Sequence, residues 1–385
     1  MNRKLYFFAG IIFGLAFLPF RPAVAQQETL ASYAVLMDAG SGTVLFEKNA
    51  DVPMMPASMS KLMSMLLLFD KIEAGEISLE DELLVSVDAW ERGGAKSGSS
   101  TMFADPNSLI RLEDLVRGVI VQSANDASIA IAEGIAGSEE AFATQMNHRA
   151  EELGLEHSNF VNASGWPDPE HYASAVDLAR IARYILFEQP EHYAYYAERD
   201  FEWNGIRQSN RNPLLGAETG VDGLKTGHTE ESGYGLVVSA KRGGRRLILV
   251  VNGLGSKQER AQEARRLLHW GFSAFRSYRL LSAGESVARV PVWHGEHRHA
   301  NLITREPVEI VWTPEQRRQL EAKLIYENPL HAPVSADTPV ARLVFSAPQA
   351  QSVEVPLWSK HAIKRSGMLS RALATLEAMV YPPVP

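Results

Sequence analysis

Three short patterns in the sequence combine side chains that can carry out nucleophilic chemistry. Ser58 and Lys61 form S-x-x-K, Ser123 and Asn125 form S-x-N, and Lys225 opens K-T-G. Each pattern occurs once in the 385 residues, and they follow in that order. A serine alone is a poor nucleophile and needs an adjacent base, and residues three apart share a face of a helix. The spacing therefore predicts that Lys61 is the base for Ser58.

A lysine acts as a base only where its pKa is lowered by desolvation or by a nearby cation. The segment 62–69 is almost entirely apolar and would desolvate Lys61. Lys225 would be the nearby cation if the fold brings it close. A helix N-terminus at Ser58 would also favour negative charge on its oxygen. The plainer interpretation is that Ser58 caps its helix, and that Ser123 and Asn125 punctuate two others.

The elements around these patterns change type along the chain. The order is two short strands, a block of helices, three consecutive strands and a final helix, which predicts an antiparallel sheet flanked by helices with its first and last elements together in space. We expect one α+β domain over residues 28–275. The segments are two strands within 33–51, a helix from Ser58, helices within 111–188, strands within 222–254 around the turn at 242–244, and a helix over 257–275.

Residues 1–25 are typical of a secretory signal peptide. Arg3 and Lys4 precede an apolar run, and Ala23 and Ala25 are the small residues of a cleavage site after position 25. The alternative is a retained membrane anchor, although the apolar run is only marginally long enough to span a bilayer. An exported chain without cysteine must draw its stability from a large core.

Composition excludes several classes of protein. With 45% hydrophobic and 22% charged residues the chain is globular, and its length favours two domains. Loss of the signal segment, which carries three basic and no acidic residues, would change the formal net charge from −8 to −11. An acidic chain without a basic, aromatic-laced patch is a poor candidate for nucleic acid. No long apolar run follows the signal, so we expect no internal transmembrane helix.

The last hundred residues differ from the preceding domain in their pattern of apolar residues and prolines. Segment 278–357 contains short alternating apolar stretches and several prolines, which predicts a small all-β domain. The tail, 358–385, mixes basic residues with apolar ones at helical spacing, which predicts an amphipathic helix that either lies in a membrane interface or docks on its own domain. The apolar residues are Ile363, Leu369, Leu373, Leu376 and Val380.

Together the three patterns resemble the motif set of the penicillin-binding proteins and class A β-lactamases. The strings VDGLKTGHT, QSANDA, SSTMF, IRQSNRN and LLHWGF are similar to the low-molecular-mass D-alanyl-D-alanine carboxypeptidases, over about residues 30–277. The β domain and tail follow that family's architecture less tightly. One departure is Ser-Ala-Asn at 123–125 in place of Ser-Gly-Asn, which removes no hydroxyl or amide. The resemblance implies a β-lactamase/transpeptidase-like fold with an all-helical lobe.

The resemblance also implies an activity and its partners. We expect a periplasmic serine-type D-Ala-D-Ala carboxypeptidase that removes the terminal D-alanine from peptidoglycan stem pentapeptides. If the tail lies in a membrane interface, the protein is peripheral on the outer face of the inner membrane. The reaction would pass through an acyl-enzyme on Ser58, and β-lactams would be covalent inhibitors. No cofactor and no metal are expected.

Residue roles follow from the same resemblance. Ser123 would hydrogen-bond between Lys61 and Lys225 and pass the proton to the leaving amine, while Asn125 would hold the substrate amide. The backbone N–H groups of Ser58 and His228 would form the oxyanion hole. On the substrate side we expect Thr226, Gly227, His228 and Arg260, with the Arg260 fork suited to a planar carboxylate.

Four alternatives compete with this expectation. A class A β-lactamase would carry a deacylating glutamate four residues before an asparagine, and no glutamate in 126–224 has that spacing. A D,D-endopeptidase acting on cross-links and a non-catalytic penicillin-binding scaffold remain open. A zinc site at His294, His297 and His299 is only weakly indicated, because these residues lack carboxylate or cysteine partners.

Overall fold

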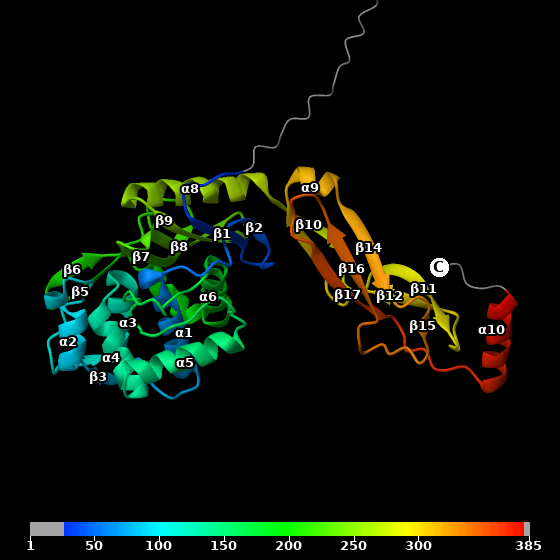
Figure 1. The fold of residues 1–385 in the computed structure, drawn as a ribbon, viewed down its shortest axis with the longest axis horizontal. Helices are drawn as coiled ribbons and strands as arrows, with labels where there is room; N and C mark the ends of the chain where they lie inside the picture. Colours follow the sequence, from blue (N-terminus) through cyan, green and yellow to red (C-terminus); the bar gives the residue numbers. More distant parts are fainter. Residues whose placement is uncertain (1–26, 381–385) are drawn as a thin grey trace, which may run out of the picture.

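The computed structural model describes residues 27–380. The expected signal peptide, residues 1–25, lies outside the described residues, as do residues 381–385. The described chain forms an α+β domain followed by a β domain, which lie side by side and are joined where α8 leads into β10 (Figure 1).

A five-stranded antiparallel sheet with the order β2-β1-β9-β8-β7 is the centre of the first domain. The first strand pairs with both the second and the last, so that Leu36 lies opposite Phe46 on one side and Leu249 on the other. The first and last strands of the domain are therefore neighbours in the sheet, as expected, and β7 forms one edge. The strands are β1 (Tyr33–Asp38), β2 (Val44–Lys48), β7 (Val221–Thr229), β8 (Gly233–Arg242) and β9 (Arg245–Leu254).

Both faces of this sheet are buried, because its strands alternate between two apolar cores. Leu36 and Leu249 belong to the core under α8 (Lys257–Ala274), together with Leu267 of that helix. Val35 and Ile248 point to the opposite face, into the core shared with the helical block. Figure 1 shows α8 covering one face and α1 and α6 lying on the other.

The helices on that side of the sheet, together with two pairs of short strands, form a lobe beside it (Figure 1). Its core contains Leu112, Leu115, Val116 and Val119, which are all fully buried. The helices are α1 (Lys61–Glu73), α2 (Val87–Gly93), α3 (Leu112–Arg117), α4 (Asn125–Ala136), α5 (Glu139–Glu152), α6 (Ala175–Glu188) and α7 (Pro190–Tyr193). The paired short strands are β3 (Glu82–Leu84) with β4 (Leu109–Arg111), and β5 (Asp200–Trp203) with β6 (Ile206–Ser209).

The C-terminal domain is built of strands around its own core, in which Trp312 is the largest fully buried side chain. Six strands follow the order β14-β16-β17-β12-β11-β15, and β10 pairs with β13. The elements are β10 (Arg276–Leu281), β11 (Ser286–Trp293), β12 (His299–Ile303), β13 (Val308–Trp312), α9 (Pro314–Arg318), β14 (Glu321–Tyr326), β15 (Leu330–His331), β16 (Ala341–Ser346) and β17 (Val353–Ser359).

The tail ends in the helix α10 (Met368–Val380), which begins later than the apolar spacing suggested. Ile363 is not part of the amphipathic face, because its side chain is buried in the β-domain core. Its backbone forms a β-bridge with Val334. Leu369 and Leu373 are mostly exposed. In the described part of the chain, no helix combines the length and the apolar character needed to cross a membrane.

His294, one of the three histidines considered as zinc ligands, contacts a neighbouring tryptophan and the tail helix. His294 Nε2 accepts a hydrogen bond from Trp293 Nε1 at 2.6 Å and lies 3.1 Å from Thr375 Oγ1 of α10. Within residues 27–380 no group of three or more His, Cys, Asp or Glu side chains is arranged to hold a metal ion. The expected architecture, an antiparallel sheet flanked by helices with a helical lobe and a C-terminal β domain, is confirmed.

Candidate active site

Ser58 and Lys61 lie where a 3-10 turn runs into α1. The turn covers Ala57–Ser60, and α1 begins at Lys61. Ser58 is therefore not the N-cap that the sequence suggested, and no side chain caps either segment. The reason is geometric: the chain turns sharply at Ala57, whose φ is +48°, and the Ser58 hydroxyl then lies 3.0 Å from Lys61 Nζ.

The Lys61 amine is fully buried and has three polar neighbours. Besides Ser58 Oγ, it contacts Asn125 Oδ1 at 2.6 Å and, closely, the Ser164 carbonyl oxygen. Burial, followed by the positive charge of Arg211, lowers the pKa of Lys61 to about 7. At neutral pH a large share of this amine is therefore uncharged.

The neighbours of Lys61 match the needs of a neutral amine. Such an amine has two N–H groups and one lone pair. The oxygens of Asn125 and Ser164 can accept the two N–H groups, which leaves the lone pair for the Ser58 hydroxyl. This arrangement suits removal of a proton from the serine.

Ser123 lies in the break between a single π turn, Gly118–Gln122, and α4, and Asn125 is the first residue of α4. Ser123 is buried in a left-handed conformation with φ of +62°, an unfavourable backbone that persists where the surroundings impose it. Among the described contacts, no hydrogen bond joins its hydroxyl to Lys61 or Lys225, so the expected bridge is not formed in this state. Asn125, which we expected to hold substrate, already touches Lys61.

Asp126 fixes the start of α4. Its buried carboxylate accepts hydrogen bonds from Thr101 Oγ1 at 2.6 Å and from the backbone N–H groups of Met102, Ala104 and Ala127 at 3.0–3.2 Å. These contacts tie the SSTMF segment to the helix that carries Asn125 on the active-site side.

Lys225 lies in the middle of β7. The strand packs against the turn that carries the serine, since a Cβ at Gly227 would lie 2.8 Å from the Pro56 carbonyl oxygen. Lys225 is buried, and its Nζ lies 3.4 Å from the Thr226 carbonyl. Burial, then the charges of Lys61, Arg211 and Arg260, holds the pKa of Lys225 well below its ordinary value.

A cleft of about 980 Å³ brings most of the expected residues together. This is within the usual size range for a small-molecule site. Lys61 and Lys225 are buried beside it. The expected residues that line the cleft are Ser58, Ser123, Asn125, Thr226, Gly227, His228 and Arg260.

Arg260 and His228 meet at the aromatic ring of Tyr234. The Arg260 guanidinium lies 5.8 Å from the ring centroid, and the His228 ring lies 3.9 Å from it. Arg260 Nη1 reaches the Gly235 carbonyl at 3.5 Å, while its buried Nε has no hydrogen-bond partner among the described residues. Burial, then Arg260 and Lys257, lowers the pKa of His228. The guanidinium fork thus keeps donors available for an anion.

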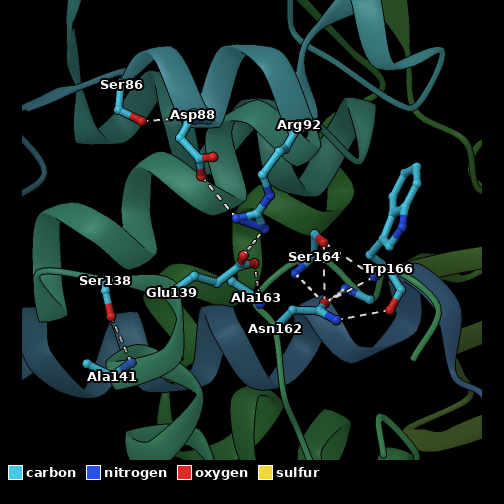
Figure 2. A network of polar contacts seen from close by, with 12 residues as sticks. Ser86, Asp88, Arg92, Ser138, Glu139, Ala141, Asn162, Ala163, Ser164 and Trp166 are labelled. Atoms are coloured by element: carbon cyan, nitrogen blue, oxygen red, sulfur yellow. Dashed lines mark hydrogen bonds and ion pairs between the residues drawn. The ribbon is translucent and has the colours of Figure 1, made fainter. Parts of the chain in front are cut away.

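Two contributors were not predicted. Arg211, in the string IRQSNRN, lines the cleft, hydrogen-bonds Ser100 Oγ and contributes to the low pKa of both lysines. The second is the Ser164 carbonyl, which comes from the loop 162–166 (Figure 2). The sequence held a signal for Arg211, because it is a basic residue like the two motif lysines, Lys61 and Lys225. It held none for Ser164, because a backbone carbonyl acceptor has no side-chain signature.

The arrangement defines a class of chemistry. A nucleophile and a base in hydrogen-bond contact favour acyl transfer. Arg211 and Arg260 line the same cleft, and their positive charge attracts an anion even in a chain of net charge −8. The geometry therefore fits an acyl group close to a free carboxylate.

Comparisons with known proteins agree with this chemistry. The D-alanyl-D-alanine carboxypeptidase family matches residues 21–256, and the C-terminal domain of penicillin-binding protein 5 matches residues 275–365. The chain is 36% identical over 381 residues to the D-alanyl-D-alanine carboxypeptidase DacD of Escherichia coli, which covers 96% of this chain and 98% of the relative.

Solved structures give the same result. Penicillin-binding protein 5 from Haemophilus influenzae superposes with a TM-score of 0.79 at 34% identity, covering 89% of this chain and 100% of that one. Penicillin-binding protein D2 from Listeria monocytogenes, in an ampicillin-bound form, is 28% identical with a TM-score of 0.56, covering 64% of this chain and 99% of that one. The resemblance seen in the sequence is thereby confirmed. The chain belongs to the D-alanyl-D-alanine carboxypeptidase family of serine-type, penicillin-binding hydrolases.

Proposed function

We propose that this protein removes the terminal D-alanine from peptidoglycan stem pentapeptides through an acyl-enzyme on Ser58. The observation that carries the proposal is the buried Lys61 amine, which lies 3.0 Å from the hydroxyl of Ser58 in a cleft that Thr226 and Arg260 also line. No cofactor takes part in the proposed reaction.

In the proposed acylation step, neutral Lys61 accepts the hydroxyl proton as Ser58 Oγ attacks the carbonyl carbon of the penultimate D-alanine. The oxyanion is held by the backbone N–H groups of Ser58 and His228. The carbon–nitrogen bond then breaks, and the proton held by Lys61 passes by way of Ser123 to the departing amine of D-alanine. A water molecule later attacks the ester, which restores Ser58 and releases the shortened peptide.

The proposed carboxylate site uses the basic end of the cleft. Thr226, Lys225, Arg260 and Arg211 are close enough to the cleft to bind or attract the terminal carboxylate. A bound anion would favour the charged form of Lys225, whose pKa is low in the empty site. With its oxygen on Lys61, Asn125 has its amide nitrogen left to bind a substrate carbonyl.

The same site would react with β-lactams. The strained amide takes the place of the scissile bond, its carboxylate takes the place of the peptide C-terminus, and the acyl product stays attached to Ser58. The ampicillin-bound Listeria relative supports this extension.

The proposed location is the periplasm, after cleavage of the signal segment at Ala25. The proposed boundaries are 28–275 for the catalytic domain, 278–357 for the β domain and 358–385 for the tail. Exposed Leu369, Leu373 and Leu376 on α10 support peripheral contact with the outer face of the inner membrane.

A truncation tests the membrane contact. Removal of residues 366–385 spares Ile363 and the β-domain core, and we expect the shortened protein to leave the membrane fraction on sedimentation. If it sediments with membranes as the full chain does, the tail is not the anchor.

The activity is tested with purified protein, a stem pentapeptide and a cross-linked muropeptide dimer. We expect the wild type to release D-alanine from the pentapeptide and Ser58→Ala to release none. Faster cleavage of the dimer would favour an endopeptidase. Penicillin labelling without release of D-alanine would favour the non-catalytic scaffold, and release by the variant at the wild-type rate would contradict the role of Ser58.

A further inference from the structure

The loop that presents the Ser164 carbonyl to Lys61 is organised by the side chain of Asn162 (Figure 2). Asn162 Oδ1 accepts the backbone N–H groups of Ser164, Gly165 and Trp166 at 3.2, 2.7 and 3.1 Å, and also the Ser164 hydroxyl at 3.3 Å. Its Nδ2 donates to the Trp166 carbonyl at 2.9 Å. One side chain therefore fixes the backbone of three consecutive residues.

A second side chain holds the loop from the helical lobe (Figure 2). Glu139, the first residue of α5, is 6% exposed, and its Oε1 accepts the backbone N–H of Ala163 at 2.9 Å. Its Oε2 forms a close ion pair with Arg92 of α2, which also contacts Asp88 at 3.0 Å. The carboxylate thus joins two helices to the residue before Ser164.

The loop has no room to shift toward the nucleophile. Gly165 has φ of +77°, and a Cβ there would lie 2.1 Å from the Ala57 carbonyl oxygen and 2.7 Å from Ser60 Oγ. The backbone of the loop is therefore in direct contact with the turn that carries Ser58. A displacement of the loop would therefore change the position of that turn and the contact of the Ser164 carbonyl with Lys61.

We propose that Glu139 and Asn162 are positioning residues for the reaction: they hold the Ser164 carbonyl on Lys61 Nζ and so direct the lone pair of the amine at Ser58. Without that carbonyl, a neutral amine held only by Asn125 could rotate its lone pair away from the hydroxyl. The inference rests on the proposed function, in which Lys61 is the base. Neither residue lines the cleft, so we expect neither to touch substrate.

The charge of Glu139 acts separately from its hydrogen bond. Among the groups around Lys61, Arg211 lowers its pKa, whereas Glu139 and Asp126 raise it. Lys225 on β7 and His171 are the other titratable groups whose charge interacts with Lys61. Removal of the Glu139 charge should therefore lower the pKa of the base while an isosteric amide keeps the acceptor for Ala163.

The first test is the pH profile of acylation by a fluorescent penicillin in full-length Glu139→Gln. We expect the acid limb to move to lower pH, with the plateau rate within about threefold of wild type because the acceptor is retained. Glu140→Gln, an exposed neighbour with the same charge change, is the control and should leave the limb in place. A Glu139→Gln profile identical to wild type would overturn the effect of the Glu139 charge on Lys61. The positioning role of Glu139 is overturned if folded Glu139→Ala, which lacks the acceptor for Ala163, keeps the wild-type plateau rate.

The second test separates geometry from charge. We expect Asn162→Ala to lower kcat for D-alanine release by roughly tenfold to a hundredfold, with little change in KM, because a displaced base affects the chemical step. Asn162→Asp keeps the acceptor oxygen and should recover most of the rate. Asn159→Ala, which removes a similar loop contact to the Glu170 carbonyl, is the matched control and should keep kcat.

Thermal denaturation identifies a variant that fails to fold, in which case Asn162→Asp and Glu139→Gln carry the test. If the wild type itself neither reacts with penicillin nor releases D-alanine, the proposed function has failed. If the wild type reacts and a folded Asn162→Ala variant matches it in kcat, the positioning role alone is overturned.

Discussion

The pH dependence of acylation follows from the burial of one amine. An ordinary lysine has a pKa of 10.5, while burial and Arg211 bring the pKa of Lys61 to about 7. At pH 7 about half of the Lys61 amine is then neutral, which is roughly a thousandfold more base than an unperturbed lysine would supply. Since the reacting form is the deprotonated one, activity is lost as the pH falls below that value and is complete above it.

The assay is the second-order rate constant for labelling by a fluorescent penicillin, measured between about pH 5 and 9. We expect the rate to rise about tenfold per pH unit on the acid side and to level off near pH 7. Lys61→Arg, which retains a charge that is not lost in this range, should be nearly inactive throughout. A rate that is flat from pH 5, or that still rises at pH 9, would refute the assignment of Lys61 as a base with a lowered pKa.

Three further changes have defined outcomes. Arg211→Gln removes a positive charge that lowers the pKa of Lys61, so the acid limb of the same profile should move to higher pH, opposite to Glu139→Gln. Gly165→Ala places a Cβ 2.1 Å from the Ala57 carbonyl in a left-handed backbone, and should lower the free energy of unfolding by at least about 2 kcal/mol, measured by chemical denaturation. Asp126→Ala leaves the hydroxyl of Thr101 and three backbone N–H groups without their acceptor, and should cost on the order of 3 kcal/mol in the same measurement. Wild-type stability in either variant, or an unmoved limb in Arg211→Gln, would contradict the reasoning for that residue.

Much of the fold was predictable because its periodicity is strong. Both faces of the central sheet are buried, so its strands read as apolar runs such as 247–251, and the long helices show regular apolar spacing. The sequence could also place S-x-x-K at the start of a helix and S-x-N in the break between two helices. It could not show that Ala57 and Ser123 adopt left-handed backbones, because neither residue type favours that region.

The surroundings of Lys61 were predictable only in part. The apolar run after it indicated burial, which the structure gives as the largest cause of its low pKa. Its contact with Ser164 was not predictable, because the acceptor is a backbone carbonyl 103 residues away in the chain. In the tail, a sequence pattern was present but predicted the wrong position. Ile363 fits the helical spacing of the tail, yet its side chain packs in the β-domain core.

The measurement that tests the central claim most directly is the site of acylation. Purified protein is incubated with penicillin, the intact mass is recorded, and the modified peptide is identified after proteolysis. We predict a single added acyl group on Ser58 in the wild type, and none in Ser58→Ala. An acyl group on another residue, or equal labelling of the variant, would contradict the account.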